Sequence, residues 1–153
     1  MRKLLLISAL IAGLSGCAAN SPYGNYSEAP AAYDKAMATD TVTHLVGMYP
    51  PALTHWNIRQ PSEDAYGAAL VALLRSRGYS VTEFSQDGTK KAQAASELPS
   101  ARGVDLRYVV DTLAPAVELY RVTVLVGDQS ISRAYIPQKN GTVAAAGSWA
   151  RKE

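Results

Sequence analysis

Residues 104–136 read VDLRYVVDTLAPAVELYRVTVLVGDQSISRAYI, and the period of this stretch is two. Apolar side chains alternate with polar ones, first in 104–111 and again from Val117 to Val126, which places Tyr120, Val122, Val124 and Val126 on one face. Gly127-Asp128 suits a tight hairpin turn before a strand at Ser130–Ile136. Asn140-Gly141 signals a second hairpin, so we expect Thr142–Ala150 to close a four-strand antiparallel meander.

Upstream of the meander the pattern is helical, then extended, twice over. A first helix is predicted over about 32–48 and ends at Pro50-Pro51, because proline cannot continue a helix. The segment 52–58 alternates as a strand with Thr54, Trp56 and Ile58 on its apolar side.

A second helix and a second strand follow. Ser62 is the expected N-cap of the helix, with Glu63 and Asp64 in its first turn, and Gly78 is the expected C-terminal cap. A strand is predicted at 79–84, and residues 86–102 are expected to form a long mobile loop. The fold class is therefore α+β, helix–strand–helix–strand and then the meander.

The chain begins with a targeting segment. Arg2 and Lys3 precede an apolar run from Leu4 to Leu14, and small residues follow it. A charged start, a short apolar run and a small-residue exit are typical of a secretory signal, whereas a spanning helix needs about 20 apolar residues. Removal of such a signal leaves 13 basic against 13 acidic residues, so the whole chain's charge of +2 is no evidence for nucleic-acid binding.

The exit of this segment is more specific. Leu14-Ser15-Gly16-Cys17 resembles a lipobox, the site read by bacterial lipoprotein signal peptidase, and Cys17 is the one cysteine among 153 residues. The resemblance implies a diacylglycerol on the Cys17 sulfur, cleavage before it and a further acyl chain on its amine, which together anchor stably. Residue 18 is alanine rather than aspartate, and the same resemblance therefore suggests export to the outer membrane, with the protein facing the periplasm.

Three parts are expected on this basis. Residues 1–16 form a lipoprotein signal peptide, 17–31 a lipidated flexible tether, and 32–153 a single α+β domain. Tyr23 and Tyr26 are unusual in a plain spacer, and they are interpreted either as contacts for a partner or as a dock onto the chain's own domain.

No pattern of catalytic or metal-binding residues stands out. His44 and His55 are the only histidines and have no paired ligand spacing, so we expect no metal and no cofactor. Ser148 lies in no nucleophile motif, and the neighbours Glu63 and Asp64 point about 100° apart on a helix. No enzymatic activity and no small-molecule substrate are therefore predicted.

Two further groups have more than one interpretation. Arg107, Arg121 and Arg133 fall on three successive predicted strands, where they would form a basic stripe on the outer face or, as we favour, pair with acidic neighbours across strands.

Trp56 and Trp149 are the large aromatic residues. Trp149, on the predicted last strand, is interpreted as core rather than as a partner anchor, and a last strand at the sheet edge would offer its backbone to another chain.

The chain resembles the TrbH family of conjugal-transfer lipoproteins. The resemblance lies chiefly within residues 1–60, in Cys17, Tyr23-Gly24-Asn25-Tyr26, Asp40, Leu45-Val46, Tyr49-Pro50-Pro51-Ala52 and Thr54. It implies a component of the mating-pair-formation apparatus, a type IV secretion system that moves plasmid DNA. It also implies secretion-channel subunits as partners. Cys17 is the one functional residue that the resemblance assigns in this sequence, as the site of palmitate and other lipid. The alternative that the residues leave open is an unrelated envelope-maintenance or ligand-binding lipoprotein of the periplasm.

Overall fold

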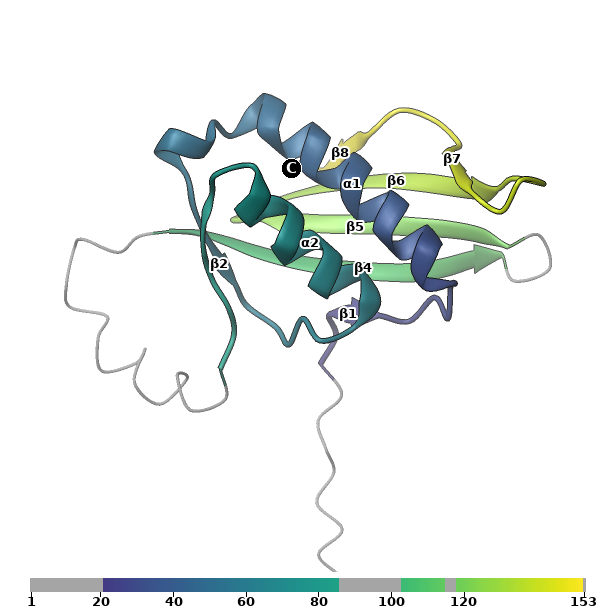
Figure 1. Cartoon of the computed structure of the whole chain (residues 1–153), viewed down its shortest axis with the longest axis horizontal. Helices are drawn as coiled ribbons and strands as arrows, with labels where there is room; N and C mark the ends of the chain where they lie inside the picture. Colours follow the sequence, from purple (N-terminus) through teal and green to yellow (C-terminus); the bar gives the residue numbers. More distant parts are fainter. Residues whose placement is uncertain (1–20, 86–102, 115–117, 153) are drawn as a thin grey trace, which may run out of the picture.

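The computed structural model describes residues 21–85, 103–114 and 118–152. Cys17 and the loop expected at 86–102 lie outside this part of the chain. Figure 1 shows the described elements, which are in order β1 (Gly24–Asn25), α1 (Ala31–Met48), a 3-10 turn (Pro51–Leu53), β2 (His55–Ile58), α2 (Ala65–Ser76), β3 (Ser80–Thr82), β4 (Val104–Ala114), β5 (Leu119–Val126), β6 (Gln129–Pro137), β7 (Val143–Ala145) and β8 (Ala150–Lys152).

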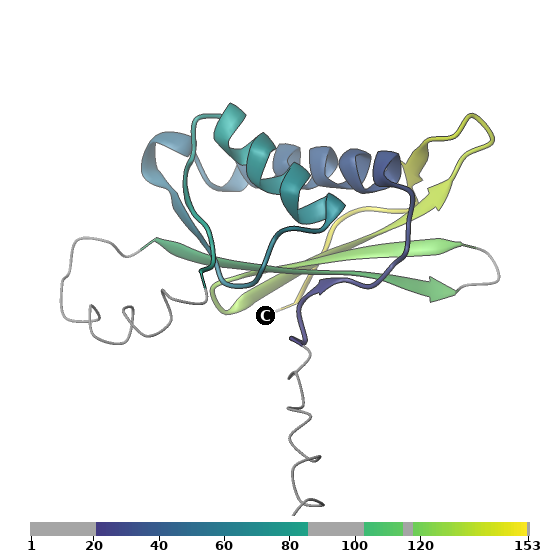
Figure 2. The same cartoon turned by 60° about the horizontal axis from the view of Figure 1, so that its bottom comes forward.

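One sheet and two helices make two layers, which confirms the α+β prediction. The strand order is β3-β2-β4-β5-β6-β7, with β1 added to β4 and β8 added to β6. The pairs from β4 to β7 are antiparallel, as the predicted meander requires, whereas β2 pairs parallel with both β3 and β4. Both helices lie on one side of the sheet (Figure 2), and no described helix covers the other side.

The core lies between the helices and the sheet, and the alternation of β5 shows how the sequence builds it. Tyr120, Val122, Val124 and Val126 are all buried, as predicted, while the residues between them are partly exposed. Trp56 on β2 is fully buried on the same side. Burying each such side chain stabilises the fold by roughly 1.5–3 kcal/mol, so the apolar face of the strands must be turned toward the helices.

The start of α2 differs from the prediction. The helix begins at Ala65, and its N-cap is Asp64 rather than Ser62, with the Gly67 amide donating to Asp64 Oδ1 at 2.9 Å. A second contact selects Asp64, because the Tyr108 hydroxyl donates to Asp64 Oδ2 at 2.5 Å from the central strand β4. The other end is as predicted: Gly78 follows the helix with φ +88°, a conformation that favours glycine.

The C-terminal segment is not the single strand that we expected over 142–150. It forms two short strands, β7 and β8, which pair side by side with successive parts of β6. Gly147 interrupts them with φ +157°, a value that residues with a side chain rarely adopt. The chain therefore leaves the sheet at this glycine and returns to it at Ala150.

The segment expected to be a flexible tether over 17–31 is in part a piece of the sheet. Gly24 and Asn25 form β1, which pairs parallel with Val109 and Val110 of β4. The Tyr26 amide then donates to the Val110 carbonyl at 2.7 Å. Backbone hydrogen bonds to the long strand β4 explain this order, since a run of small polar residues gives no periodic signal of its own. No helix in the described ranges is long and apolar enough to cross a membrane.

Candidate functional site

One polar cluster of the domain joins α1 to β6. Arg133 Nη1 donates to both carboxylate oxygens of Asp40, at 3.1 and 2.9 Å, and the Tyr135 hydroxyl donates to Asp40 Oδ2 at 2.6 Å. Burial, and next the hydrogen bond to Asp40, raise the pKa of Tyr135 above its usual range. These charge-assisted hydrogen bonds fix α1 to the sheet, and the Asp40 and Arg133 side chains that make them are partly shielded from water.

The same cluster holds the segment between β7 and β8. Arg133 Nε donates to the Gly147 carbonyl at 2.7 Å, and its guanidinium lies 5.9 Å from the centre of the Trp149 ring. The Trp149 ring stacks on His44 with centroids 4.9 Å apart and planes 10° apart. Burial lowers the pKa of His44 and Arg133 lowers it further, while Asp40 opposes them. In this C-terminal clasp (Asp40, His44, Arg133, Tyr135 and Trp149) the hydrogen bonds of Arg133 and Tyr135 join β6 to α1 and to the segment that carries Trp149, so its chemistry is that of a structural joint.

A second polar cluster fastens the N-terminal segment. The Asn25 amide donates to Asp34 Oδ1 at 3.0 Å, and Asn25 Oδ1 accepts from the amide and hydroxyl of Ser27. Thr112 on β4 donates to the Ser27 carbonyl at 3.1 Å. Asp34 is only 2% exposed, and its burial raises its pKa to about 6, against the effect of the Asn25 hydrogen bond and with a further rise from Asp64. This N-terminal latch (Asn25, Ser27, Asp34 and Thr112) ties the start of the chain to α1 and β4.

The tyrosines of the N-terminal segment contact the chain's own domain. The Arg107 guanidinium lies over the Tyr23 ring at 5.3 Å from its centre. The Tyr26 hydroxyl donates to the Ser21 carbonyl, and the Tyr26 side chain is 53% exposed. Of the two interpretations that the sequence left open, docking onto the domain is therefore the one that the structure shows for Tyr23.

The three arginines do not form one stripe. Arg121 pairs with Asp111 across β4 and β5, with contacts of 3.1 and 2.5 Å, which confirms cross-strand pairing. Arg107 and Arg121 lie on the side of the sheet opposite the helices. Arg133 lies on the helix side, because it pairs in register with the buried Val122. The cross-strand pairing that we favoured does not extend to Arg133, because the alignment of β6 with β5 puts Arg133 on the helix side, where it pairs with Asp40 of α1.

The remaining candidates from the sequence are placed apart. His55 lies on β2 and contacts the Thr82 hydroxyl at 2.8 Å, whereas His44 lies on α1 and stacks on Trp149 in the clasp. No three potential metal ligands gather anywhere in the described ranges. Asp64 acts as a helix cap, Glu63 is exposed, and Ser148 lies exposed between β7 and β8. Trp56 and Trp149 both pack on the core, and both indole N–H groups lack a hydrogen-bond partner among the described residues.

The sequence analysis did not predict that Asp40, Tyr135 and Asp34 form the hydrogen bonds that hold the two clusters together. Asp40 entered only through the family resemblance, and its partners lie 93 and 95 residues further along the chain. Asp34 carried one available signal, a lone acid in the first turn of a helix. Acids in a first helical turn are common for reasons of the helix dipole, so that signal did not distinguish it.

The two clusters hold the N-terminal and C-terminal segments of the described chain to a two-layer α+β domain. The model of the family described as conjugal transfer protein TrbH matches residues 20–153. The chain therefore belongs to the TrbH family of conjugal transfer proteins. Membership implies involvement in conjugal transfer by type IV secretion and association with the cell envelope, and the family is not a known family of enzymes. No curated protein and no solved structure matches the chain.

Proposed function

We propose that this protein is an outer-membrane lipoprotein of the mating-pair-formation apparatus, anchored through lipid on Cys17, and that it anchors or stabilises channel components during plasmid transfer. Membership of the TrbH family is the observation that carries the proposal. The leader and Leu14-Ser15-Gly16-Cys17 supply the anchor. The role needs no catalytic site, and we propose that the protein has none.

The described structure supports an anchoring role in two ways. The first strand, β1, begins seven residues after Cys17, so the lipid and the folded domain are separated by a short piece of chain. The N-terminal latch then fixes that piece to α1 and β4 through Asn25 and Asp34. A domain held this close to a membrane meets its neighbours at a raised effective concentration, so weak contacts with channel subunits are sufficient.

The test is Cys17→Ser in the full chain, with Asn20→Ser as the matched control, which introduces the same residue three positions later and keeps the thiol. We expect Cys17→Ser to remain an unprocessed precursor without radiolabelled palmitate and to leave the outer-membrane fraction. Plasmid transfer should fall by about a hundredfold or more, the lower end of what tethering contributes. Asn20→Ser should be labelled, fractionated and active like the natural chain.

Three results would contradict the proposal. Palmitate that enters Cys17→Ser as well as the natural chain would exclude the lipid assignment. Undiminished plasmid transfer by the unlipidated variant would exclude the anchoring role. Recovery of the natural protein with cell-wall fragments alone, with no secretion-channel subunit in the pull-down, would favour a separate role in envelope maintenance.

A further inference from the structure

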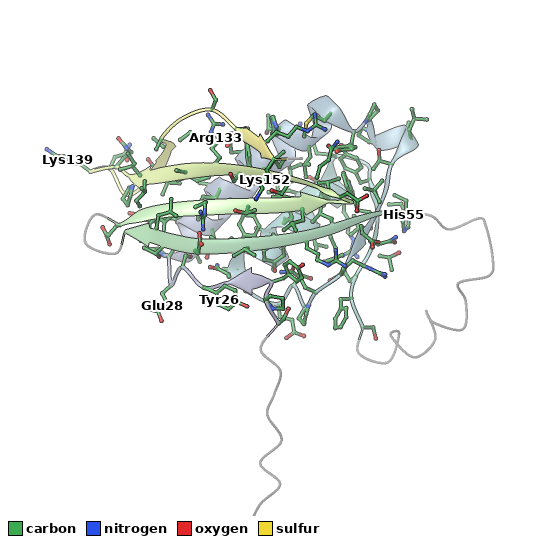
Figure 3. All side chains as sticks on the ribbon, turned by 180° about the vertical axis from the view of Figure 1, so that it is seen from behind. Tyr26, Glu28, His55, Arg133, Lys139 and Lys152 are labelled. Carbon is green, nitrogen blue, oxygen red and sulfur yellow. The ribbon has the colours of Figure 1, made fainter. Side chains whose placement is uncertain are left out.

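The side of the sheet opposite the helices is uncovered in the described chain, and its side chains follow from the strand register. They alternate with the buried Leu106, Tyr108 and Val110 of β4 and with their partners on β5 and β6. This open face includes Asp105, Arg107, Val109 and Asp111 of β4, Arg121, Thr123 and Leu125 of β5, Ser130 and Ser132 of β6, and Lys152 of β8. Figure 3 views the molecule from this side, with Lys152 over the strands and Tyr26 at the margin where β1 lies.

The charges of the open face are unequally compensated. Its carboxylates are neutralised within the domain, because Asp105 pairs with Arg59 at 3.1 Å and Asp111 pairs with Arg121 at 2.5 Å. Arg107 and Lys152, in contrast, form no ion pair with any residue that the structure describes. Arg107, Leu125, Ser130 and Lys152 lie opposite one another across four strands, so the two cations belong to one row. This row therefore carries two cations, separated by Leu125 and Ser130, that have no ion-pair partner among the described residues.

The chain enters the domain over this same face. Tyr23 lies against Arg107, and Gly24 pairs beside Val109. Figure 2 shows β1 at the edge of the sheet and the described residues before it running away from α1 and α2. Cys17 precedes Tyr23 by six residues, which span at most about 20 Å when fully extended. A lipid on Cys17 would therefore lie within about 20 Å of Tyr23 and of the open face beside it.

We propose that the open face of the sheet rests on the phospholipid headgroups of the membrane that holds the anchor, and that α1 and α2 point away from it toward periplasmic subunits. This inference rests on the proposed lipidation of Cys17. The chemistry is complementary: Arg107 and Lys152 meet headgroup phosphates, and Tyr23 and Tyr26 have the amphipathic rings that lie at membrane interfaces. Each cation contributes modestly near a charged surface, but the tether makes the contact intramolecular.

The experiment uses the full-length lipidated protein in vesicles of phosphatidylethanolamine with phosphatidylglycerol as the anionic component. Because lipidation consumes the thiol of Cys17, an introduced cysteine is the single free thiol. Thr123→Cys places it in the middle of the open face, and Ala68→Cys places it on the exposed side of α2. Each is labelled with a fluorophore, and quenching by lipids with spin-labelled headgroups is measured. We expect strong quenching at position 123 and little at position 68.

A charge variant tests whether the two cations hold the open face against the membrane. Replacing both Arg107→Gln and Lys152→Gln should reduce quenching at position 123 and raise it at position 68, because the domain then turns freely on its tether. Lys35→Gln, an exposed cation on α1, is the matched control and should leave the difference unchanged. High salt should act like the double variant, because it screens exposed charges.

The outcomes separate this inference from the proposed function. Protein that lacks palmitate and does not stay with the vesicles overturns both. Vesicle-bound lipidated protein with equal quenching at positions 123 and 68 overturns the orientation alone. Disulfide dimers formed rapidly by Thr123→Cys but not by Ala68→Cys, without headgroup quenching, would instead assign the open face to a second copy of the chain.

Discussion

The buried carboxyl of Asp34 makes the stability of the domain depend on pH in a defined direction. Its pKa is about 6 in the folded protein, against an ordinary value of 3.8, chiefly because burial disfavours the charged form. The folded state therefore holds the proton more tightly than the unfolded chain does. The contribution of this group is fully present below about pH 4 and is lost as the pH rises through about 6.

The magnitude follows from the two pKa values. Each tenfold change in a proton-binding constant is worth about 1.4 kcal/mol, so ionised Asp34 lowers the free energy of unfolding at pH 7 by about 3 kcal/mol relative to the protonated form. Asp34→Asn keeps the shape and an oxygen for the Asn25 amide. We expect a gain of about 2–3 kcal/mol at pH 7 and almost none at pH 4.

Urea unfolding followed by tryptophan fluorescence, repeated from pH 4 to pH 8, measures this difference at each pH for the natural chain and for Asp34→Asn. Comparing the two chains cancels the titration of the other groups, which both share. Glu63→Gln is the control, since it removes an exposed negative charge that makes no side-chain hydrogen bond in the described structure. A difference between Asp34→Asn and the natural chain that stays constant across the pH range, or a variant less stable at pH 7, would refute the reasoning.

Further predictions concern packing and the C-terminal clasp. Gly67→Ala should destabilise the domain by roughly 1–3 kcal/mol or more in urea unfolding, because a Cβ there would lie 2.0 Å from the Tyr108 hydroxyl. Gly47→Ala, a helical site with nothing within 4 Å, should instead stabilise it by about 0.5–1 kcal/mol, and equal effects at both sites would contradict the packing argument. A double-mutant cycle of Asp40→Asn and Arg133→Gln should give a coupling of about 1 kcal/mol, reduced by the partial exposure of both side chains, and additive losses would show that the ion pair contributes nothing.

Local patterns predicted the elements whose neighbours in space are also neighbours in sequence. The meander from β4 to β7 and the end of α2 at Gly78 were of this kind, because alternation, hairpin turns and a left-handed cap act over a few residues. The N-cap of α2 was misplaced for the opposite reason. Ser62 and Asp64 are both good caps in isolation, and Tyr108, 44 residues further along, decides between them.

The two polar clusters, like that cap, depend on contacts between residues that are far apart in the sequence. The clasp needs Arg133 on the helix side of the sheet, which depends on how β6 pairs with β5, and a slip of one residue would reverse it. The latch needs β1, whose two residues carry no strand signal and pair only because β4 has a free edge beside them.

The sequence by itself determined the α+β class, which strand residues face the core, and the likeness to a conjugal transfer family. Hydrophobic periodicity and short motifs involve residues that are close together along the chain, so both can be recognised without the structure. Only the tertiary structure determined that Asp34 is buried, that Arg133 meets Asp40 and that the open face receives the N-terminal segment. Burial, ion pairing and which face a strand presents depend on contacts between residues far apart in the chain, and their free energies arise only when those residues meet.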